Sequence, residues 1–457
     1  MSDSKKDPDM SSHRLPNDEY LKNFSDIKPP LSQYEAHIEA NRCLYCEDAP
    51  CISACPTGIN IPSFIQKIAD KNTDGAATTI LDSNILGGSC ARVCPTEILC
   101  EGVCVRNKSP EFSPVKIGRL QRFALDTYQP DQHPYQRSPA TGRTIAVVGA
   151  GPAGLACAHK LSRLGHNVTI FDKQAKAGGL NEYGIAQYKM VDNFAQKEVD
   201  FIMALGGIQL KTQQALGEQL QLDSLRNEFD AVFLGVGLSN SKALGLEQTD
   251  IHGLESSLDF ISELRQSDDL SQITIGNKIV VIGAGNTAID IACQSKRLGA
   301  EQVTLVYRRG ESHMPATSKE LEFAKQNSVK IITWARPSSL KVINNQLVAI
   351  QFEKTALDTS NNLIGTESFF ELPADTVYKA IGQSFLFNCF AGSEPPELIN
   401  GRIDINEQFQ TSLNNVWAGG DCVVLGEDLT VQAVEHGKQA ADSIHHHLIW
   451  SKGNGDA

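Results

Sequence analysis

The sequence has few aromatic residues and no excess of positive charge. Of its 457 residues 7% are aromatic, and 41 Lys and Arg stand against 54 Asp and Glu, which gives a net charge of −13. Proteins that bind nucleic-acid phosphates need a basic face, so this balance argues against a nucleic-acid role. No apolar run approaches the roughly 20 residues of a membrane span. The start, MSDSKKDP, lacks the apolar segment of a signal peptide, and we expect a cytoplasmic protein that does not bind membranes.

The length and the hydrophobic content nevertheless allow several cores. The chain is 41% hydrophobic, which is ordinary for a soluble protein, and its length suggests roughly two to four domains.

Cysteine is concentrated in one stretch. Eight of the twelve cysteines lie between Cys43 and Cys104, in a first run C-x2-C-x4-C-x3-C-P and a second run C-x3-C-P-x4-C-x3-C. Each of these two runs contains a Cys-Pro pair, and two such runs favour a pair of [4Fe–4S] clusters. Zinc is the alternative because C-x2-C is also a zinc spacing, although zinc seldom uses these interleaved gaps. Disulfides are less favoured in a reduced cytoplasm.

Helices are expected to separate the two cysteine runs. Residues 1–30 are polar and we expect a disordered start, after which Ser32 and Glu35 have the spacing of a capping box. Apolar residues at helical spacing follow at 62–69 and 76–81. The segment 117–123 has an amphipathic pattern in which Gln121, on the pattern alone, faces solvent. A proline-rich linker at about 128–143 ends an iron–sulfur domain of residues 1–140.

A dinucleotide-binding unit begins at Thr144. An apolar strand enters a glycine turn, a helix follows, and a second strand ends at Asp172. In such a unit the first glycine makes the turn, the second lets backbone N–H groups approach a pyrophosphate, and the third lets the helix pack on the strand. The acid accepts hydrogen bonds from ribose. The predicted contacts are Gly149, Ala150, Gly151, Pro152, Ala153, Gly154 and Asp172.

The same pattern returns at Lys278, with glycines at Gly283 and Gly285 and a second strand that ends in Arg308-Arg309 instead of an acid. An internal repeat supports the pairing, because residues 229–237 mirror residues 374–382. Two different dinucleotides are therefore expected, and flavin with nicotinamide is the usual pair. The two arginines either grip a 2′-phosphate, which favours NADP(H), or hold a diphosphate or a surface carboxylate.

Late in the chain a strand ends in Gly419-Gly420-Asp421, and a helix begins near Thr430. This arrangement fits a flavin domain that resumes after an inserted domain, with Asp421 at the ribityl chain and the helix N-terminus at the flavin N1–O2 edge. We therefore expect an α/β fold in which two Rossmann-like domains follow a helical iron–sulfur domain. The predicted ranges are 141–254 and 385–457 for FAD, and 255–384 for NAD(P).

Together these motifs resemble the small subunit of glutamate synthase and the N-terminal half of dihydropyrimidine dehydrogenase, from about Ser32 onward. The segments CEDAPC at 46–51, CPT at 94–96 and IGRLQRF at 117–123 are most similar to the dihydropyrimidine dehydrogenases. The large members continue into a barrel with FMN and the pyrimidine site, whereas this sequence stops at Ala457. It therefore resembles the separate flavin subunit (PreT-type) of a bacterial NAD-dependent enzyme.

The resemblance implies two ligand sets, with Cys90 as a spare thiol and Gln121 as an unusual ligand. One cluster would use Cys43, Cys46, Cys51 and Cys104, and the other Cys55, Cys94, Cys100 and Gln121. Further flavin contacts would be Gly179, Leu180, Lys189, Gly420, Asp421 and Thr430. The nicotinamide nucleotide would be bordered by Gly283, Ala284, Gly285, Asn286, Thr287, Arg308, Arg309, Ala380 and Gly382.

The resemblance also implies an electron relay from NAD(P)H through FAD and two [4Fe–4S] clusters. The acceptor would be an FMN/iron–sulfur (PreA-type) subunit that reduces uracil or thymine, in a heterotetramer. Because hydride transfer between cofactors needs positioning, no residue of this chain is expected to act as a general acid or base. The alternatives are a small subunit of NADPH-dependent glutamate synthase, a related NAD(P)H:ferredoxin oxidoreductase subunit, and a non-enzymatic cluster-binding, redox-responsive scaffold.

Overall fold

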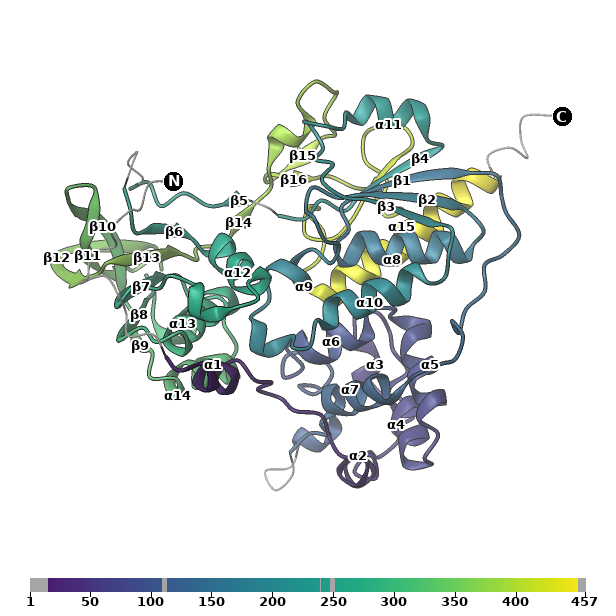
Figure 1. Cartoon of the computed structure of the whole chain (residues 1–457), viewed down its shortest axis with the longest axis horizontal. Helices are drawn as coiled ribbons and strands as arrows, with labels where there is room; N and C mark the ends of the chain where they lie inside the picture. The colour runs from purple at the N-terminus through teal and green to yellow at the C-terminus, as the bar shows by residue number, and fades with distance from the viewer. Residues whose placement is uncertain (1–14, 109–112, 239, 247–250, 451–457) are drawn as a thin grey trace. The chain divides into compact units, whose positions relative to one another are not determined.

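The computed structural model describes residues 15–108, 113–238, 240–246 and 251–450, and the chain divides into two units (Figure 1). We call the larger one the main unit; it contains Lys28–Glu182, Asp192–Ser239 and the residues from Phe385 onward. The other, the insert unit, contains residues 15–27 together with Tyr183–Val191 and Asn240–Ser384. Each unit is described by itself below.

The first part of the main unit is helical. Phe64, Ile65, Ile80 and Leu120 are fully buried and hold the helices together. The predicted capping box is present, because the Ser32 backbone N–H donates to Glu35 Oε2 at 2.8 Å and the Glu35 N–H donates to Ser32 Oγ at 3.3 Å. The elements are α2 (Gln33–Ala40), α3 (Pro50–Ser53), α4 (Ile61–Ala69), α5 (Thr73–Ser83), α6 (Gly87–Val93), the 3₁₀ turn η2 (Val105–Lys108) and α7 (Ile117–Thr127).

A five-stranded parallel sheet follows in the main unit, in the order β17-β4-β1-β2-β3. Its central strands β1 and β4 are near-continuous apolar runs because both faces of the sheet are covered by helices. The strands are β1 (Thr144–Val148), β2 (Asn167–Phe171), β3 (Ile208–Lys211), β4 (Ala231–Leu234) and β17 (Val416–Ala418). The principal helices are α8 (Pro152–Arg163), α10 (Phe194–Met203), α11 (Leu222–Glu228) and α15 (Thr430–Trp450). Helices α8 and α15 run side by side (Figure 1).

The position of β17 confirms the predicted interruption of this sheet. Val416 pairs with Val232 and Ala418 with Leu234, so a late strand completes a sheet that begins at Thr144. The η6 turn (Phe387–Phe390) and a short hairpin of β15 (Leu398–Ile399) and β16 (Arg402–Ile403) precede β17.

The insert unit repeats the pattern with a second parallel sheet, in the order β6-β13-β7-β8-β9. An antiparallel sheet, β10-β11-β12, adjoins it within the unit. The strands of the two sheets are β6 (Leu254–Ser256), β7 (Lys278–Ile282), β8 (Gln302–Val306), β9 (Lys330–Ile332), β10 (Ala335–Ile343), β11 (Gln346–Leu357), β12 (Leu363–Pro373) and β13 (Thr376–Lys379). A two-stranded ladder joins β5 (Asn240–Ser241) to β14 (Gln383–Ser384).

Four α-helices and three 3₁₀ turns belong to the described residues of the insert unit. They are α1 (Asn17–Asn23), η3 (Gln187–Lys189), α12 (Ser257–Gln266), η4 (Leu270–Gln272), α13 (Asn286–Arg297), η5 (Glu311–His313) and α14 (Ser318–Gln326).

Helix α1 corrects the expected disordered start. Residues 1–14 lie outside the described residues, but Tyr20 and Phe24 are buried in the core of the insert unit. The two aromatic side chains, four residues apart, fix a segment whose overall polarity suggested disorder. The predicted linker forms no helix or strand over 128–143, yet Tyr135 is held by a hydrogen bond to Asp82 at 2.9 Å. Among the described helices, none is both long and apolar enough to cross a membrane.

Candidate redox cofactor sites

Four cysteines of the helical part line one cavity. Cys43, Cys46 and Cys51 come from the first run and Cys104 from the end of the second. The rest of the wall is mostly apolar and includes Ile61, Ile65, Val115 and Ile117. The structure therefore brings together the four residues that the family resemblance assigned to the first cluster.

The electrostatics of this cavity suit iron. Burial raises the pKa of the Cys43 thiol, and burial followed by the neighbouring Cys43 thiol raises that of Cys51 to about 11. Without a cation these thiols stay protonated at neutral pH. A metal centre displaces the protons and compensates the burial of thiolate charge, so the donor set fits the group.

The second predicted set also gathers in one place. A hydrogen bond with Cys90, burial and the nearby thiols of Cys100 and Cys55 raise the pKa of Cys94 well above its usual range. Burial, then the charges of Glu101 and Cys55, raises the pKa of Cys100. Three of the four predicted ligands, Cys55, Cys94 and Cys100, therefore interact with one another.

Gln121 lies on α7 and is only 7% exposed, so its pattern-based assignment to solvent is wrong. Its Nε2 donates to the carbonyl oxygen of Gly87 at 2.7 Å. A carbonyl oxygen can face only the N–H side of an amide, and Oε1 therefore points away from Gly87. No hydrogen bond to Oε1 is found within the described residues, and an amide oxygen is the atom that would bind iron.

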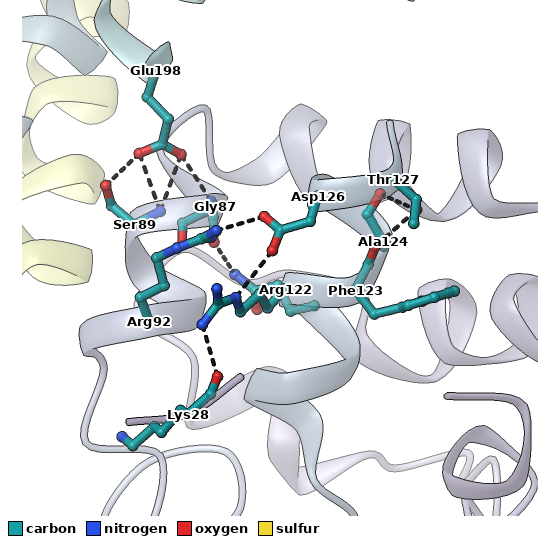
Figure 2. Close-up of polar contacts among 12 residues, drawn as sticks. Lys28, Gly87, Ser89, Arg92, Arg122, Phe123, Ala124, Asp126, Thr127 and Glu198 are labelled. Atoms are coloured by element: carbon teal, nitrogen blue, oxygen red, sulfur yellow. Dashed lines mark hydrogen bonds and ion pairs between the residues drawn. The ribbon is translucent and has the colours of Figure 1, made fainter. Parts of the chain in front are cut away.

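Charged groups surround α6 and α7 (Figure 2). Asp126 pairs with Arg92 at 2.6 Å and with Arg122 at 3.0 Å. Glu198 of α10 accepts hydrogen bonds from the Ser89 hydroxyl and from the backbone N–H groups of Gly88 at 2.9 Å and Ser89 at 3.1 Å at the start of α6. Burial raises the pKa of Glu198 to about 7. Within the described part of the chain, no group of three His, Cys, Asp or Glu side chains has the spacing to hold a single metal ion.

The three glycines of the turn after β1 have two different roles: two avoid steric clashes, and one leaves space for a ligand. Gly149 has φ +101°, and a Cβ there would lie 2.3 Å from the Gly235 carbonyl oxygen. A Cβ on Gly154 would lie 1.9 Å from the carbonyl oxygen of Gly149. Gly151 precedes α8, and a Cβ added there would meet only Gly179 Cα, at 3.8 Å. Backbone N–H groups at the start of α8, with Pro152 in its first turn, are thus accessible to a phosphate.

Asp172 anchors this turn. It accepts hydrogen bonds from the backbone N–H groups of Ala150 at 2.6 Å and Gln174 at 2.7 Å. Burial raises its pKa. Its remaining oxygen lone pairs can accept from ribose hydroxyls. Gly178 donates to the Ala150 carbonyl oxygen at 2.8 Å, which brings Gly179 and Leu180, the first residue of α9 (Leu180–Tyr183), to the same turn.

The Gly419-Gly420 pair after β17 lies close to the start of α8 in the main unit. A Cβ on Gly420 would lie 3.0 Å from Ala153 Cβ, and one on Gly437 of α15 would lie 2.1 Å from the Ala153 carbonyl oxygen. His436 Nδ1 accepts from the Gly420 N–H at 3.2 Å. Burial, and then the charge of Asp428, raises the pKa of Asp421 to about 6. The predicted flavin residues of the main unit therefore gather around the starts of α8 and α15, and Thr430 Oγ1 donates to Asn181 Oδ1 at 3.2 Å.

The second glycine turn has the same geometry in the insert unit. Gly283 has φ +137°, and a Cβ there would lie 2.0 Å from the Ala380 carbonyl oxygen, whereas one on Gly285 meets nothing within 4 Å. The Ala284 carbonyl accepts from Ala316 N–H at 3.0 Å. Gly382 has φ +100°. Asn286 and Thr287 begin α13, and all the predicted nucleotide contacts from 283–287 and 380–382 lie along one edge of the sheet.

The two arginines after β8 differ. Arg308 is exposed, while Arg309 is partly buried and its Nε has no hydrogen-bond partner. No ion pair to either is found in the part of the chain that the structure describes. Both remain available to a nucleotide phosphate.

Lys189, a predicted flavin contact, belongs to the insert unit. In the insert unit its ammonium is buried between Asp290 at 2.7 Å and Glu320 at 2.8 Å, and these charges raise its pKa although burial opposes them. These contacts lend no support to a flavin contact, which stays a prediction.

Comparison with known proteins identifies the family. Residues 20–133 match the family model described as dihydropyrimidine dehydrogenase domain II, 4Fe-4S cluster, and residues 143–437 match the pyridine nucleotide-disulphide oxidoreductases. The chain is 36% identical over 437 residues to the NAD-dependent dihydropyrimidine dehydrogenase subunit PreT of Escherichia coli K12, covering 95% of this chain and 98% of PreT. It is 34% identical to the small chain of E. coli glutamate synthase [NADPH], covering 92% and 93%. The chain belongs to this PreT and glutamate synthase small-chain family.

Solved structures support the fold of this chain. Mycobacterium tuberculosis FprA in complex with NADPH aligns with a TM-score of 0.57 at 19% identity, covering 70% of this chain and 87% of FprA. Lactococcus lactis thioredoxin reductase aligns with a TM-score of 0.54 at 16% identity, covering 67% and 99%. The family matches confirm the predicted fold class, the NAD(P)-dependent oxidoreductase activity and the [4Fe–4S], FAD and NAD(P)H cofactors. The number of clusters and the individual ligands stay predictions.

Proposed function

We propose that this chain is the electron-entry subunit of a dihydropyrimidine dehydrogenase. It oxidises NAD(P)H through FAD and two [4Fe–4S] clusters and supplies a partner FMN subunit, which interconverts uracil or thymine and their 5,6-dihydro forms. The observation that carries this proposal is the cavity formed by Cys43, Cys46, Cys51 and Cys104 in the same unit as a flavin-type glycine turn. The relatives named PreT support the pyrimidine substrate.

The residues of the main unit bind and orient the flavin. The N-terminus of α8 offers free N–H groups to the pyrophosphate, and Asp172 accepts from ribose. The N-terminus of α15, a helix of 21 residues, supplies positive potential beside Asp421. When bound, NAD(P)H would supply a hydride, FAD would pass its two electrons on singly and release its proton separately, and the clusters would carry the electrons onward. No side chain is needed as an acid or a base, because any proton for the pyrimidine would come from the partner.

The partner would meet an apolar surface at the cysteine loops. Leu44 and Tyr45 lie between two proposed ligands of the first cluster and are 56% and 39% exposed. Ile98 and Val103, near the end of the second run, are also exposed. Apolar residues of this size are normally buried, and their position among ligands suits a surface that docks an electron-accepting subunit. A PreA-type subunit is the proposed occupant, in a heterotetramer and in the cytoplasm.

The experiment is anaerobic purification followed by stepwise reconstitution. We expect about eight irons and one FAD per chain, bleaching by NADH or NADPH, and uracil reduction only after a pyrimidine-binding FMN subunit is added. Leu44→Glu should weaken that coupled reaction while leaving electron transfer to a small artificial acceptor intact, and Leu21→Glu at an exposed position of α1 is the matched control. Protein that contains zinc but neither iron nor flavin would refute the proposal.

A second candidate is the small subunit of a glutamate synthase, which the 34% identity to that chain supports. Co-purification with a glutaminase-containing large subunit would favour it. A cluster-binding scaffold without catalysis would instead show cofactors but no transfer of electrons from NADH or NADPH to any acceptor.

A further inference from the structure

Asn84 is a fully buried polar residue between α5 and α6 with an unambiguous orientation. Its Oδ1 accepts a hydrogen bond from the backbone N–H of Leu86 at 3.0 Å. Because a backbone N–H can only donate, the oxygen must lie on that side. The amide NH₂ of Asn84 is therefore fixed on the opposite side.

The two N–H groups of Asn84 are directed at two further buried groups. Nδ2 lies 3.2 Å from Cys90 Sγ and 3.4 Å from Thr57 Oγ1. Cys90 is 2% exposed and Thr57 is 5% exposed, so water does not compete for either. The amide thus donates one hydrogen bond to a thiol and one to a hydroxyl.

Those hydrogen bonds decide where the protons of the thiol and the hydroxyl go. Each group has one hydrogen and accepts from Asn84, so that hydrogen can be donated only to another acceptor, and a cysteine that binds iron carries no hydrogen and can only accept. The Thr57 hydroxyl lies 3.3 Å from Cys55 Sγ. Cys90 lies one helical turn before Cys94, and their thiols are hydrogen-bonded, with Cys94 as the donor in the metal-free protein. With iron bound to Cys94, only the Cys90 thiol would have a hydrogen to donate. Both recipients belong to the proposed second ligand set.

We propose that Asn84 is a positioning residue that tunes the second cluster by directing two donors, Thr57 and Cys90, at its cysteine ligands. The proposal rests on the second ligand set given above. Hydrogen bonds to ligand sulfurs stabilise the more negative, reduced state and so raise the reduction potential. Cys90 then has a role as a donor, rather than as a spare thiol.

The C-terminal helix holds this network in place. Lys438 Nζ donates to the carbonyl oxygen of Ser83 at 2.8 Å and to that of Thr57 at 3.4 Å. Its neighbour Gly437 lies against the Ala153 carbonyl oxygen of the flavin-type turn. The backbone on which Asn84 and Thr57 stand is therefore attached to the helix that borders the proposed flavin site.

The test is an anaerobic redox titration of the holoprotein followed by EPR, which resolves the two clusters. Thr57→Val removes the hydroxyl at nearly constant volume, and Cys90→Ala removes the thiol. We expect each change to shift the potential of one cluster to a more negative value and to leave the other unchanged. Cys90→Ser keeps a donor, so its cluster potential should stay close to that of the wild type. Asn84→Leu should lower the potential at least as far as either single change.

Thr79→Val is the matched control, because Thr79 bonds Gly75 and Lys67 in the same helical part but no proposed ligand. Unchanged potentials in Thr57→Val and Cys90→Ala would overturn the proposal even if Asn84→Leu failed to fold. A wild-type protein with only one cluster would instead refute the ligand set, so the two failures are distinguishable by iron content.

Discussion

The amide nitrogen of Gln121 donates a hydrogen bond to the carbonyl oxygen of Gly87 at 2.7 Å. This contact fixes which end of the side chain is available as a ligand, because the oxygen is turned the other way. An oxygen ligand from a neutral amide leaves a cluster one unit less negative than a fourth thiolate would.

Replacing Gln121 by Cys should therefore lower the potential of one cluster and alter its EPR spectrum, since the new ligand brings a negative charge. Anaerobic redox titration measures both. Gln66→Cys on the exposed face of α4 adds a cysteine that is not among the proposed ligands and should change neither. An unchanged spectrum and potential in Gln121→Cys would remove Gln121 from the ligand set.

Asp421→Ala should release flavin rather than unfold the protein. Losing a hydrogen bond from a ribityl hydroxyl to a carboxylate costs roughly 1.5–3 kcal/mol, or about 10- to 100-fold in the flavin Kd. In the flavin-free protein the pKa of Asp421 is raised to about 6 by burial, and a donating ligand prefers the ionised form. Flavin affinity should fall as the pH drops below 6, and Asp421→Asn should abolish that dependence. Fluorescence titration at several pH values measures it; equal affinity at pH 5 and 8 in the wild type would contradict it.

Glu198 should make the folded protein less stable as the pH rises from about 4.5 to about 7. Its folded pKa is about 7, raised by burial above the ordinary value of 4.5. Folding therefore takes up a proton between these values, and stability falls by up to about 1.4 kcal/mol per unit as pH rises through that window. Glu198→Gln mimics the protonated form, so the difference in thermal unfolding between wild type and variant should change between pH 5 and 7.5. A constant difference would contradict the assignment.

Gly285→Ala should raise the KM for the nicotinamide nucleotide without unfolding the protein. A Cβ at Gly285 meets nothing within 4 Å, and φ −84° suits alanine, so the methyl group would only occupy the approach of a pyrophosphate. Steady-state kinetics with NADH and NADPH would show this, with flavin content unchanged. Gly151→Ala is the reciprocal control, because it should reduce flavin retention and spare the KM of the flavin-loaded fraction. An unaltered KM in Gly285→Ala would place the nucleotide elsewhere.

The sequence predicted those parts of the fold that local chemistry dictates. Glycine is required at 149 and 283 because a Cβ added at either position would lie within 2.3 Å of a carbonyl oxygen. Such turns therefore give a regular glycine spacing that can be recognised in the sequence. The capping box at Ser32 is equally local. The cavity at Cys43 followed from spacing and family resemblance together.

Tertiary contacts explain what the sequence pattern did not predict. Gln121 seemed exposed because polar residues usually face solvent, whereas α7 is buried on most of its surface. The partners of Lys189 lie 101 and 131 positions further along the chain, and nothing local marks them. Asn84 carries no motif either; only the pairing of its oxygen with Leu86 reveals its orientation.

The order of strands in the main unit bears on how the protein is made. Strand β17 is the only described neighbour of β4 besides β1, and it is translated after the whole insert unit. Until then a nascent chain exposes the backbone of β4 as an open edge, which readily pairs with other chains. Translation that stalls within the insert unit would therefore yield an aggregation-prone product, and chaperone demand should peak at that stage of synthesis.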